Sequence, residues 1–165
     1  MPKMRNDDLS QDAEALYEAL NQLVRVYQFR DRDRICCYDV SVTQCYAIET
    51  LVKHGPLRLQ GLADEMFLDK STASRVVDTL ERKGYLLRVE DSEDRRAVRV
   101  QATEAGTKLY EQIRADLIAE EQAMISCMAP ELRQGALVLL RQLTRAAEVR
   151  CGLASDCCPP KSKEP

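Results

Sequence analysis

Apolar residues recur at helical spacing along almost the whole chain of 165 residues, and one short segment departs from that pattern. Between residues 85 and 102 the period becomes that of two strands, 85–89 and 97–101, around a charged hairpin loop. The helical pattern predicts helices at 9–29, from Ser41 or Thr43 to His54, at 60–66, 71–83 and 103–127, and from Pro130 to Arg150. With a short extended link at 57–59, the sequence therefore predicts a mainly α chain of order α-α-β-α-α-β-β-α-α.

Charged and helix-breaking residues set the expected helix ends. The charged run at 31–34 is expected to end the first helix. Ser71 is expected to cap the helix at 71–83, and Gly84 follows its last turn in the position that glycine favours.

The composition excludes several classes of protein. With 45% hydrophobic and 31% charged residues, the chain is an ordinary globular protein. It has no run of about 20 apolar residues and no apolar segment behind its N-terminal basic residues, so we expect no membrane partner and a cytoplasmic location. The net charge of −3 does not indicate nucleic-acid binding, but screening allows a local patch to differ from the total.

Two short helices joined by a tight turn, residues 60–83, have the spacing of a helix-turn-helix unit. The second helix has one apolar side, and its other side carries small hydroxyl residues and arginines. Hydroxyl side chains near a helix N-terminus can approach base edges or phosphates, and an arginine can donate two hydrogen bonds to guanine. A solvated polar helix face is the alternative. The candidate DNA-binding residues here are Ser71, Thr72, Ser74, Arg75, Thr79 and Arg82.

The charge of the hairpin favours the DNA-binding interpretation. Residues 70–99 carry eight basic and six acidic side chains, a net charge of +2, whereas the remainder of the chain carries −5. Arg95 and Arg96, near the hairpin tip, are expected to reach a minor groove or the phosphate backbone. Asp91 and Asp94 are expected to brace these two arginines.

A known family shares these motifs. Residues 71–85 resemble the recognition helix of the MarR family of winged-helix regulators, 91–96 resemble its wing motif, and 103–106 resemble the start of its next helix. Thr43-Gln44, Gly55-Pro56 and Leu62-Ala63 also match, and the resemblance extends over residues 9–150. It implies a winged helix-turn-helix domain at 41–103 and dimerisation helices with a connector at 1–40 and 104–150. The cysteine-containing tail is 151–165.

The resemblance further implies a homodimer in which the first and the last two helices interlock between subunits. Apolar stripes at 9–27, 109–124 and 132–146 agree with this, because they would overfill the core of a small monomer. Two reading helices would then meet half-sites about one DNA turn apart, so the expected partner is double-stranded DNA with an imperfectly palindromic operator. Family members usually repress transcription until a ligand, an oxidant or a metal releases them.

Seven cysteines depart from the family pattern. Two pairs of them are adjacent in the sequence, Cys36-Cys37 and Cys157-Cys158. Adjacent Cα atoms lie about 3.8 Å apart, whereas a disulfide prefers about 5.5–6 Å, so neither pair should close on itself. Two neighbouring thiolates and a third sulfur can instead hold a soft ion such as As(III). We therefore expect no required cofactor, but a thiophilic effector bound across the dimer. The candidate ligands are Cys36, Cys37, Cys151, Cys157 and Cys158.

Other interpretations of the cysteines stay open. A cross-subunit disulfide could respond to oxidants, an aromatic ligand could replace thiol chemistry, and a metal carrier without DNA function would explain the cysteines but not the hairpin. Cys127 is expected to pack in the core, and Cys45 is open between packing and function. An enzyme is not expected, because there is no Gly-rich phosphate loop, no nucleophile elbow and one histidine.

Overall fold

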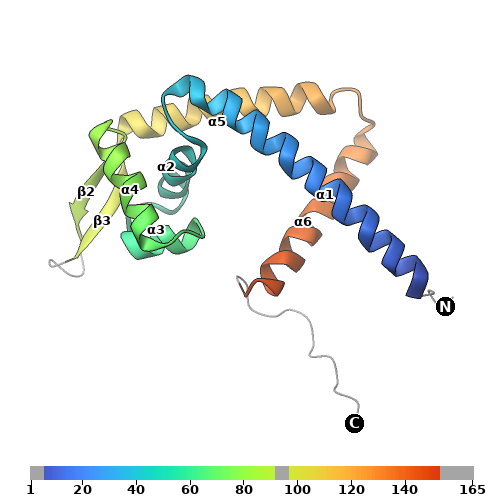
Figure 1. Ribbon diagram of the computed structural model, residues 1–165. Helices are drawn as coiled ribbons and strands as arrows, with labels where there is room; N and C mark the ends of the chain where they lie inside the picture. Colours follow the sequence, from blue (N-terminus) through green and yellow to red (C-terminus); the bar gives the residue numbers. More distant parts are fainter. Residues whose placement is uncertain (1–5, 92–96, 153–165) are drawn as a thin grey trace, which may run out of the picture. The chain divides into compact units, whose positions relative to one another are not determined.

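The computed structural model describes residues 6–91 and 97–152, which form helices and one small antiparallel sheet (Figure 1). The predicted element order is confirmed, with a short 3-10 helix, η1, added after the first helix. No helix of this part of the chain is long and apolar enough to cross a membrane. The elements are α1 (Asn6–Ile35), η1 (Cys36–Tyr38), α2 (Val42–His54), β1 (Leu57–Arg58), α3 (Leu59–Glu65), α4 (Lys70–Arg82), β2 (Leu86–Glu90), β3 (Val98–Ala102), α5 (Glu104–Ile125) and α6 (Pro130–Arg150).

The chain divides into two compact units within α5, at residues 1–116 and 117–165. The first unit contains the helix-turn-helix pair, the sheet and the buried core. The core side chains come from the end of α1, the connector after it, α2, α3, α4, β2, β3 and the first half of α5. They include Ile35, Ile48, Leu62, Leu80, Leu86 and Ile113.

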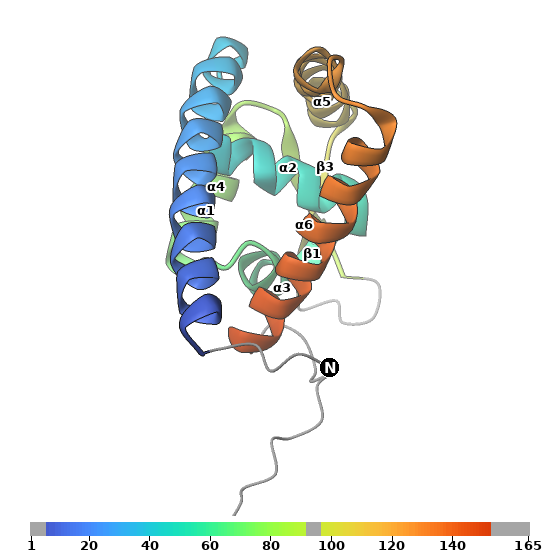
Figure 2. The ribbon, with the colours of Figure 1, turned by 90° about the vertical axis from the view of Figure 1, so that its right-hand side faces the viewer.

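Helix α1 is longer than the sequence pattern predicted. The charged run at 31–34 does not end it, and the helix continues unbroken to Ile35 (Figure 2). The run contains no glycine or proline, and alternating opposite charges are compatible with a helix. Arg30 donates a hydrogen bond from Nε to Asp31 at 3.0 Å, and Ile35 is buried, which anchors the last turn in the core.

Both helices of the helix-turn-helix unit end in the same way. The residue after each last turn has a left-handed backbone, with φ +54° at Phe67 and +77° at Gly84. The next amide then donates to a carbonyl five residues earlier, Leu68 to Ala63 and Tyr85 to Leu80. The predicted position of Gly84, directly after the last turn of α4, is therefore confirmed. Phe67 takes the same role although its side chain makes that conformation costly.

The sheet has the strand order β1-β3-β2, and both pairings are antiparallel. The β2–β3 hairpin, here called the wing, is one residue later at each strand than the sequence pattern predicted. Arg58 on β1 lies directly opposite Arg99 on β3, and Arg88 on β2 lies opposite Val100. Two arginines thus meet across one strand pair, and they need an acidic partner.

Apolar side chains remain exposed on the terminal helices of the single chain. In α1 they are spread along the helix, and α6 has no buried residue. They include Leu9, Leu16, Leu23, Leu132, Leu137, Val138, Leu139 and Leu140.

Candidate nucleic-acid interface

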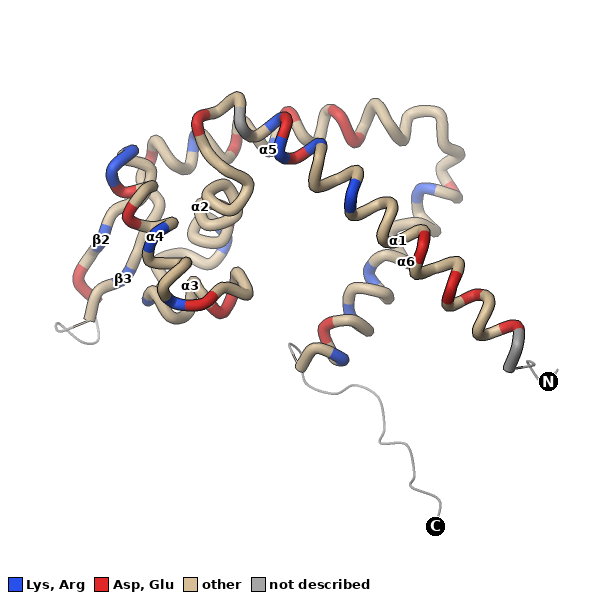
Figure 3. Tube along the Cα trace, in the orientation of Figure 1, with Lys and Arg blue, Asp and Glu red and all other residues tan. Residues whose placement is uncertain are grey.

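Helix α4 has one buried side and one polar side. Ala73, Val77 and Leu80 are buried, and the helix contacts α2, α3 and β2. The opposite side, here called the α4 polar face, carries both signs of charge, as does β2 (Figure 3). The α4 polar face consists of Ser71, Thr72, Ser74, Arg75, Asp78, Thr79 and Arg82.

The N-cap of α4 is Asp69, not Ser71 as the sequence pattern predicted. The Asp69 carboxylate accepts hydrogen bonds from the Thr72 amide at 2.9 Å, the Thr72 hydroxyl at 2.6 Å and the Ser71 hydroxyl at 2.5 Å. The bonds from Ser71 and Thr72 hold the pKa of this carboxyl well below its usual range. A charged N-cap both satisfies free amides and complements the helix dipole, which is why it displaces serine here.

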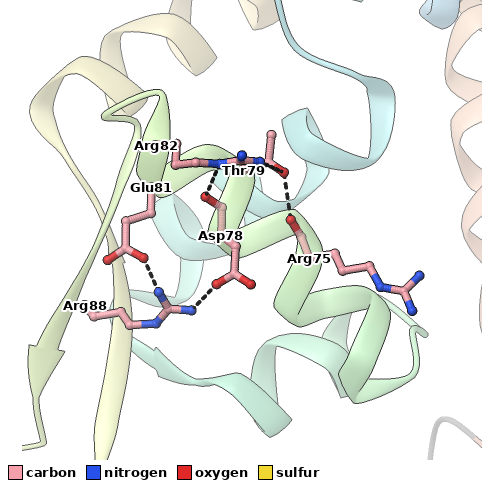
Figure 4. A network of polar contacts seen from close by, with 6 residues as sticks. All are labelled: Arg75, Asp78, Thr79, Glu81, Arg82 and Arg88. Carbon is pink, nitrogen blue, oxygen red and sulfur yellow. Dashed lines mark hydrogen bonds and ion pairs between the residues drawn. The ribbon is translucent and has the colours of Figure 1, made fainter.

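The middle of the α4 polar face contains two arginines with different surroundings (Figure 4). Arg75 is exposed, and its side chain points away from the neighbouring polar network. Arg82 lies back along the helix, where it donates to the Thr79 hydroxyl at 3.2 Å and to the Asp78 carbonyl at 3.4 Å. The Thr79 hydroxyl in turn donates to the Arg75 carbonyl at 2.9 Å. Of the two, Arg75 is presented to an incoming partner without rearrangement.

Arg88 connects the wing to α4. From β2, its Nη2 donates to Asp78 at 2.6 Å, and its Nη1 donates to Glu81 one turn further along α4 (Figure 4). The hydrogen bond to Asp78 and the charge of Glu81 raise the pKa of the Arg88 guanidinium. One side chain thus holds two carboxylates of the recognition-helix segment.

Asp91 anchors the loop end of the wing, directly after β2. Its carboxylate is buried and forms ion pairs with Arg58 at 2.7 Å and Arg99 at 3.0 Å. The sequence pattern did not predict these two partners, whose charges the carboxylate neutralises where they face each other across β1 and β3. The expectation that Asp91 also braces Arg95 and Arg96 stays a prediction. The predicted tip residues Asp94, Arg95 and Arg96 lie outside the described residues.

The connector between α1 and α2 contacts the end of α4. Lys83, the C-cap residue of α4, donates from Nζ to the Asp39 carbonyl and lies 3.4 Å from the Asp39 carboxylate. Asp39 has a left-handed backbone with φ +56°. The adjacent Tyr38 donates its hydroxyl to Asp116 of α5. The segment that carries Cys36 and Cys37 is thus linked to two helices.

The described cysteines fall into two environments. Cys37, Cys127 and Cys151 are exposed in the single chain, so the expected core position of Cys127 is wrong there. Cys45 is buried, and burial raises the pKa of its thiol to about 11, with Glu49 and Asp31 adding to the shift. Cys157 and Cys158 lie outside the described residues. Among the residues that the structure does describe, no three histidine, cysteine or acidic side chains gather as a metal site.

Comparison with known proteins identifies the family of this fold. The sequence profile of the MarR family matches residues 40–98. The HTH-type transcriptional regulator MhqR of Bacillus subtilis is 31% identical over 116 residues, which cover 70% of this chain and 80% of MhqR. The chain belongs to the MarR family. The HTH-type transcriptional repressor MdtR of the same organism is 25% identical over 142 residues, 86% of this chain and 90% of MdtR.

Solved structures share the MarR fold. A MarR family protein from Bacillus stearothermophilus matches with a TM-score of 0.78 at 23% identity, covering 84% of this chain and 96% of that one. The S. aureus MepR–DNA complex matches with a TM-score of 0.65 at 19% identity, covering 78% and 94%. The family match and the curated relatives identify this chain as a DNA-binding transcriptional regulator rather than an enzyme.

Several polar contacts of this region were not predicted from the sequence. The N-cap role of Asp69 had a signal, because aspartate three residues before Thr72 is a capping arrangement. The pairing of Arg88 with α4 and of Lys83 with Asp39 joins elements that are distant in the pattern. Sequence spacing carries no information on such contacts.

Proposed function

We propose that the protein binds a palindromic operator as a homodimer, with one α4 polar face and one wing per half-site, and represses transcription there. The observation that carries this proposal is the division of α4 into a buried apolar side and an exposed side from which Arg75 projects. An exposed helix of this kind fits the major groove, where base edges differ in their hydrogen-bonding groups.

The residues have different expected roles at the DNA. Ser71 and Thr72 donate their hydroxyl hydrogens to Asp69, so their oxygens face a partner as acceptors, which suits the amino groups of adenine or cytosine. Arg75 has the geometry for a guanine. Ser74, Thr79 and Arg82 lie beside them on the α4 polar face, and Arg82, with Arg95 and Arg96, supplies charge for phosphates.

The exposed apolar side chains of α1 and α6 support the homodimer. Leu132 is 61% exposed and Val138 is 56% exposed in the single chain. Several exposed apolar side chains on one helix are typical of an interface with another protein. The helical segments assigned to dimerisation, residues 1–40 and 104–150, contain these side chains.

The DNA-binding roles are tested with a duplex that the wild-type protein selects from a random 30-base-pair library. Fluorescence anisotropy then compares Arg75→Ala and Arg75→Lys on that duplex. We expect Arg75→Ala to lose about tenfold or more in affinity, and Arg75→Lys to keep non-specific affinity but lose discrimination at one base pair. Lys108→Ala is the matched control, because Lys108 is an exposed cation on α5 that pairs with Glu104. Unchanged binding by Arg75→Ala would contradict the role of the α4 polar face.

For the effector, we propose a thiophilic metalloid such as As(III), held by Cys36 and Cys37 with Cys151, Cys157 or Cys158 of the partner subunit. The exposure of Cys37 supports this, since a thiol must be reachable to bind an ion. The links from Asp39 to Lys83 and from Tyr38 to Asp116 support a route to DNA release, because ordering this connector would act on α4 and α5.

Native mass spectrometry of the reduced, anaerobic protein offered As(III), zinc and Cu(I) in competition tests this proposal. We expect a dimer with stoichiometric As(III), and loss of binding to the selected duplex after arsenite is added. The Cys36→Ser/Cys37→Ser variant should bind the duplex and ignore arsenite, while Cys127→Ser should respond normally. Arsenite release from the double variant would exclude the vicinal pair.

The alternatives give different results in the same samples. A disulfide-linked dimer that forms with peroxide and releases DNA would indicate an oxidant sensor. Release by an aromatic acid alone would indicate an organic ligand. A protein that binds the ion but selects no duplex would be a metal carrier.

A further inference from the structure

Asp78 occupies a position where an acidic residue is unfavourable for DNA binding. It lies on the α4 polar face, three residues after Arg75 and four residues before Arg82. At these spacings a carboxylate is a side-chain neighbour of both arginines and can pair with either. It also repels phosphates, and Glu81 adds a second negative charge one turn away.

The structure gives these carboxylates a different partner. Asp78 and Glu81 both accept from Arg88, which reaches α4 from β2 of the wing (Figure 4). Within residues 6–91 and 97–152, no ion pair joins Asp78 to Arg75 or Arg82. The guanidinium of Arg75 points away from the network, so its charge stays available.

We propose that Arg88 is a positioning residue for DNA binding, which occupies the carboxylates of Asp78 and Glu81 so that neither of them pairs with Arg75 or Arg82. This inference rests on the proposed role of the α4 polar face.

The exposure of Arg88, Asp78 and Glu81 allows a positioning role in DNA binding to be distinguished from a role in stability. Arg88 is 36% exposed and Asp78 is 53% exposed. Exposed ion pairs contribute little to the free energy of unfolding, because water and salt screen them. The loss of Arg88 should therefore be visible in DNA affinity and nearly invisible in the thermal midpoint.

Three variants test the proposal on the duplex selected by the wild-type protein: Arg88→Met, Asp78→Asn/Glu81→Gln, and the combination of all three substitutions. We expect Arg88→Met to weaken binding about tenfold, because Asp78 then competes for Arg75 and Arg82. Asp78→Asn/Glu81→Gln should bind at least as tightly as wild type. In that background, Arg88→Met should cost less than about twofold, since no carboxylates remain to be held.

Each contrary result overturns the proposal. If Arg88→Met still costs tenfold in the neutralised background, Arg88 contacts DNA itself. If Asp78→Asn/Glu81→Gln loses tenfold, Asp78 reads a base. If Arg88→Met binds normally, the pairing has no effect on DNA binding, although the proposed function stands. If the wild-type protein selects no duplex at all, the proposed function fails first, and the inference fails with it.

Discussion

Gly106, in the first turn of α5, lies close to the backbone of Tyr85, the residue before β2. A Cβ atom there would lie 2.2 Å from the Tyr85 carbonyl oxygen. Thr103 fixes this junction, because its hydroxyl donates to the Gly84 carbonyl at 2.7 Å and accepts from the Gly106 amide at 3.0 Å. Only glycine fits without moving backbone against backbone.

We expect Gly106→Ala to lower the free energy of unfolding by about 2–3 kcal/mol, as overpacking against a rigid neighbour does. Urea denaturation followed by circular dichroism measures this. Gly61→Ala is the control, since its Cβ would meet no atom within 4 Å and alanine favours the helix. Equal midpoints for Gly106→Ala and wild type would contradict the close approach.

Cys45 and Cys37 should differ in thiol reactivity and in its dependence on pH. With a pKa of about 11, only about one in a thousand Cys45 thiols is ionised at pH 8, and the thiolate is the reactive form. We expect iodoacetamide to modify Cys37 first, and the Cys45 rate to rise about tenfold per pH unit up to pH 10. Tandem mass spectrometry distinguishes the sites, and urea-unfolded protein should show similar rates at both. Native Cys45 reacting as fast as Cys37 would contradict its burial.

The same shift affects stability. Because the pKa of Cys45 is higher in the folded chain than its ordinary value of 9.0, the folded state holds the proton more tightly. Its contribution to stability is present below pH 9 and is lost between pH 9 and about 11. A sensing role through the Cys45 thiolate at neutral pH is therefore unfavourable, which leaves the exposed cysteines as candidates.

At the scale of elements, the wing depends on one buried carboxylate. Asp91→Asn keeps the shape but removes the carboxylate charge that Arg58 and Arg99 share where they face each other across β1 and β3. Like charges directly opposite on neighbouring strands are destabilising. We expect a loss of about 2 kcal/mol in the free energy of unfolding, less than for fully buried pairs because Arg58 is half exposed.

Thermal denaturation and binding to the selected duplex measure the effect of Asp91→Asn. The thermal midpoint and the DNA affinity should both fall, because this carboxylate holds the wing to β1. Glu90→Gln removes the same charge from the adjacent exposed residue and should change neither quantity. A normal thermal midpoint for Asp91→Asn would show that the strand hydrogen bonds alone hold the wing.

The wing and α4 also show what sequence patterns can and cannot predict. The position of α4, its buried side and the turn at Gly84 follow from the spacing of apolar residues and glycine along the chain, and this spacing is visible in the sequence. The described partners of Asp91 and Arg88 depend on which strands pair, so the sequence pattern predicted neither set. The predicted end of α1 was wrong for another reason. Burial of Ile35 favours one more helical turn, and this outweighs the effect of the charged run at 31–34.

At the scale of the whole molecule, the exposed apolar side chains of α6 require a covering surface. Leu139 is 54% exposed, and α6 as described has no buried residue in the single chain. In a two-fold symmetric dimer one substitution acts twice, once in each subunit. At about 1.5–3 kcal/mol for each buried leucine, Leu139→Glu should cost about 3 kcal/mol or more of association free energy.

That loss corresponds to a dimer dissociation constant raised by about a hundredfold or more. Sedimentation velocity across protein concentrations measures it. The selected duplex should be bound more weakly in parallel, because in the proposed arrangement each monomer meets only one half-site. Gln134→Glu adds the same charge to an exposed polar position of α6 and should leave both quantities unchanged. Dimers that persist in Leu139→Glu with normal DNA affinity would remove α6 from the interface. The apolar side chains of α1 would then be the remaining candidates for the interface that sets the spacing of the two α4 helices in the proposed dimer.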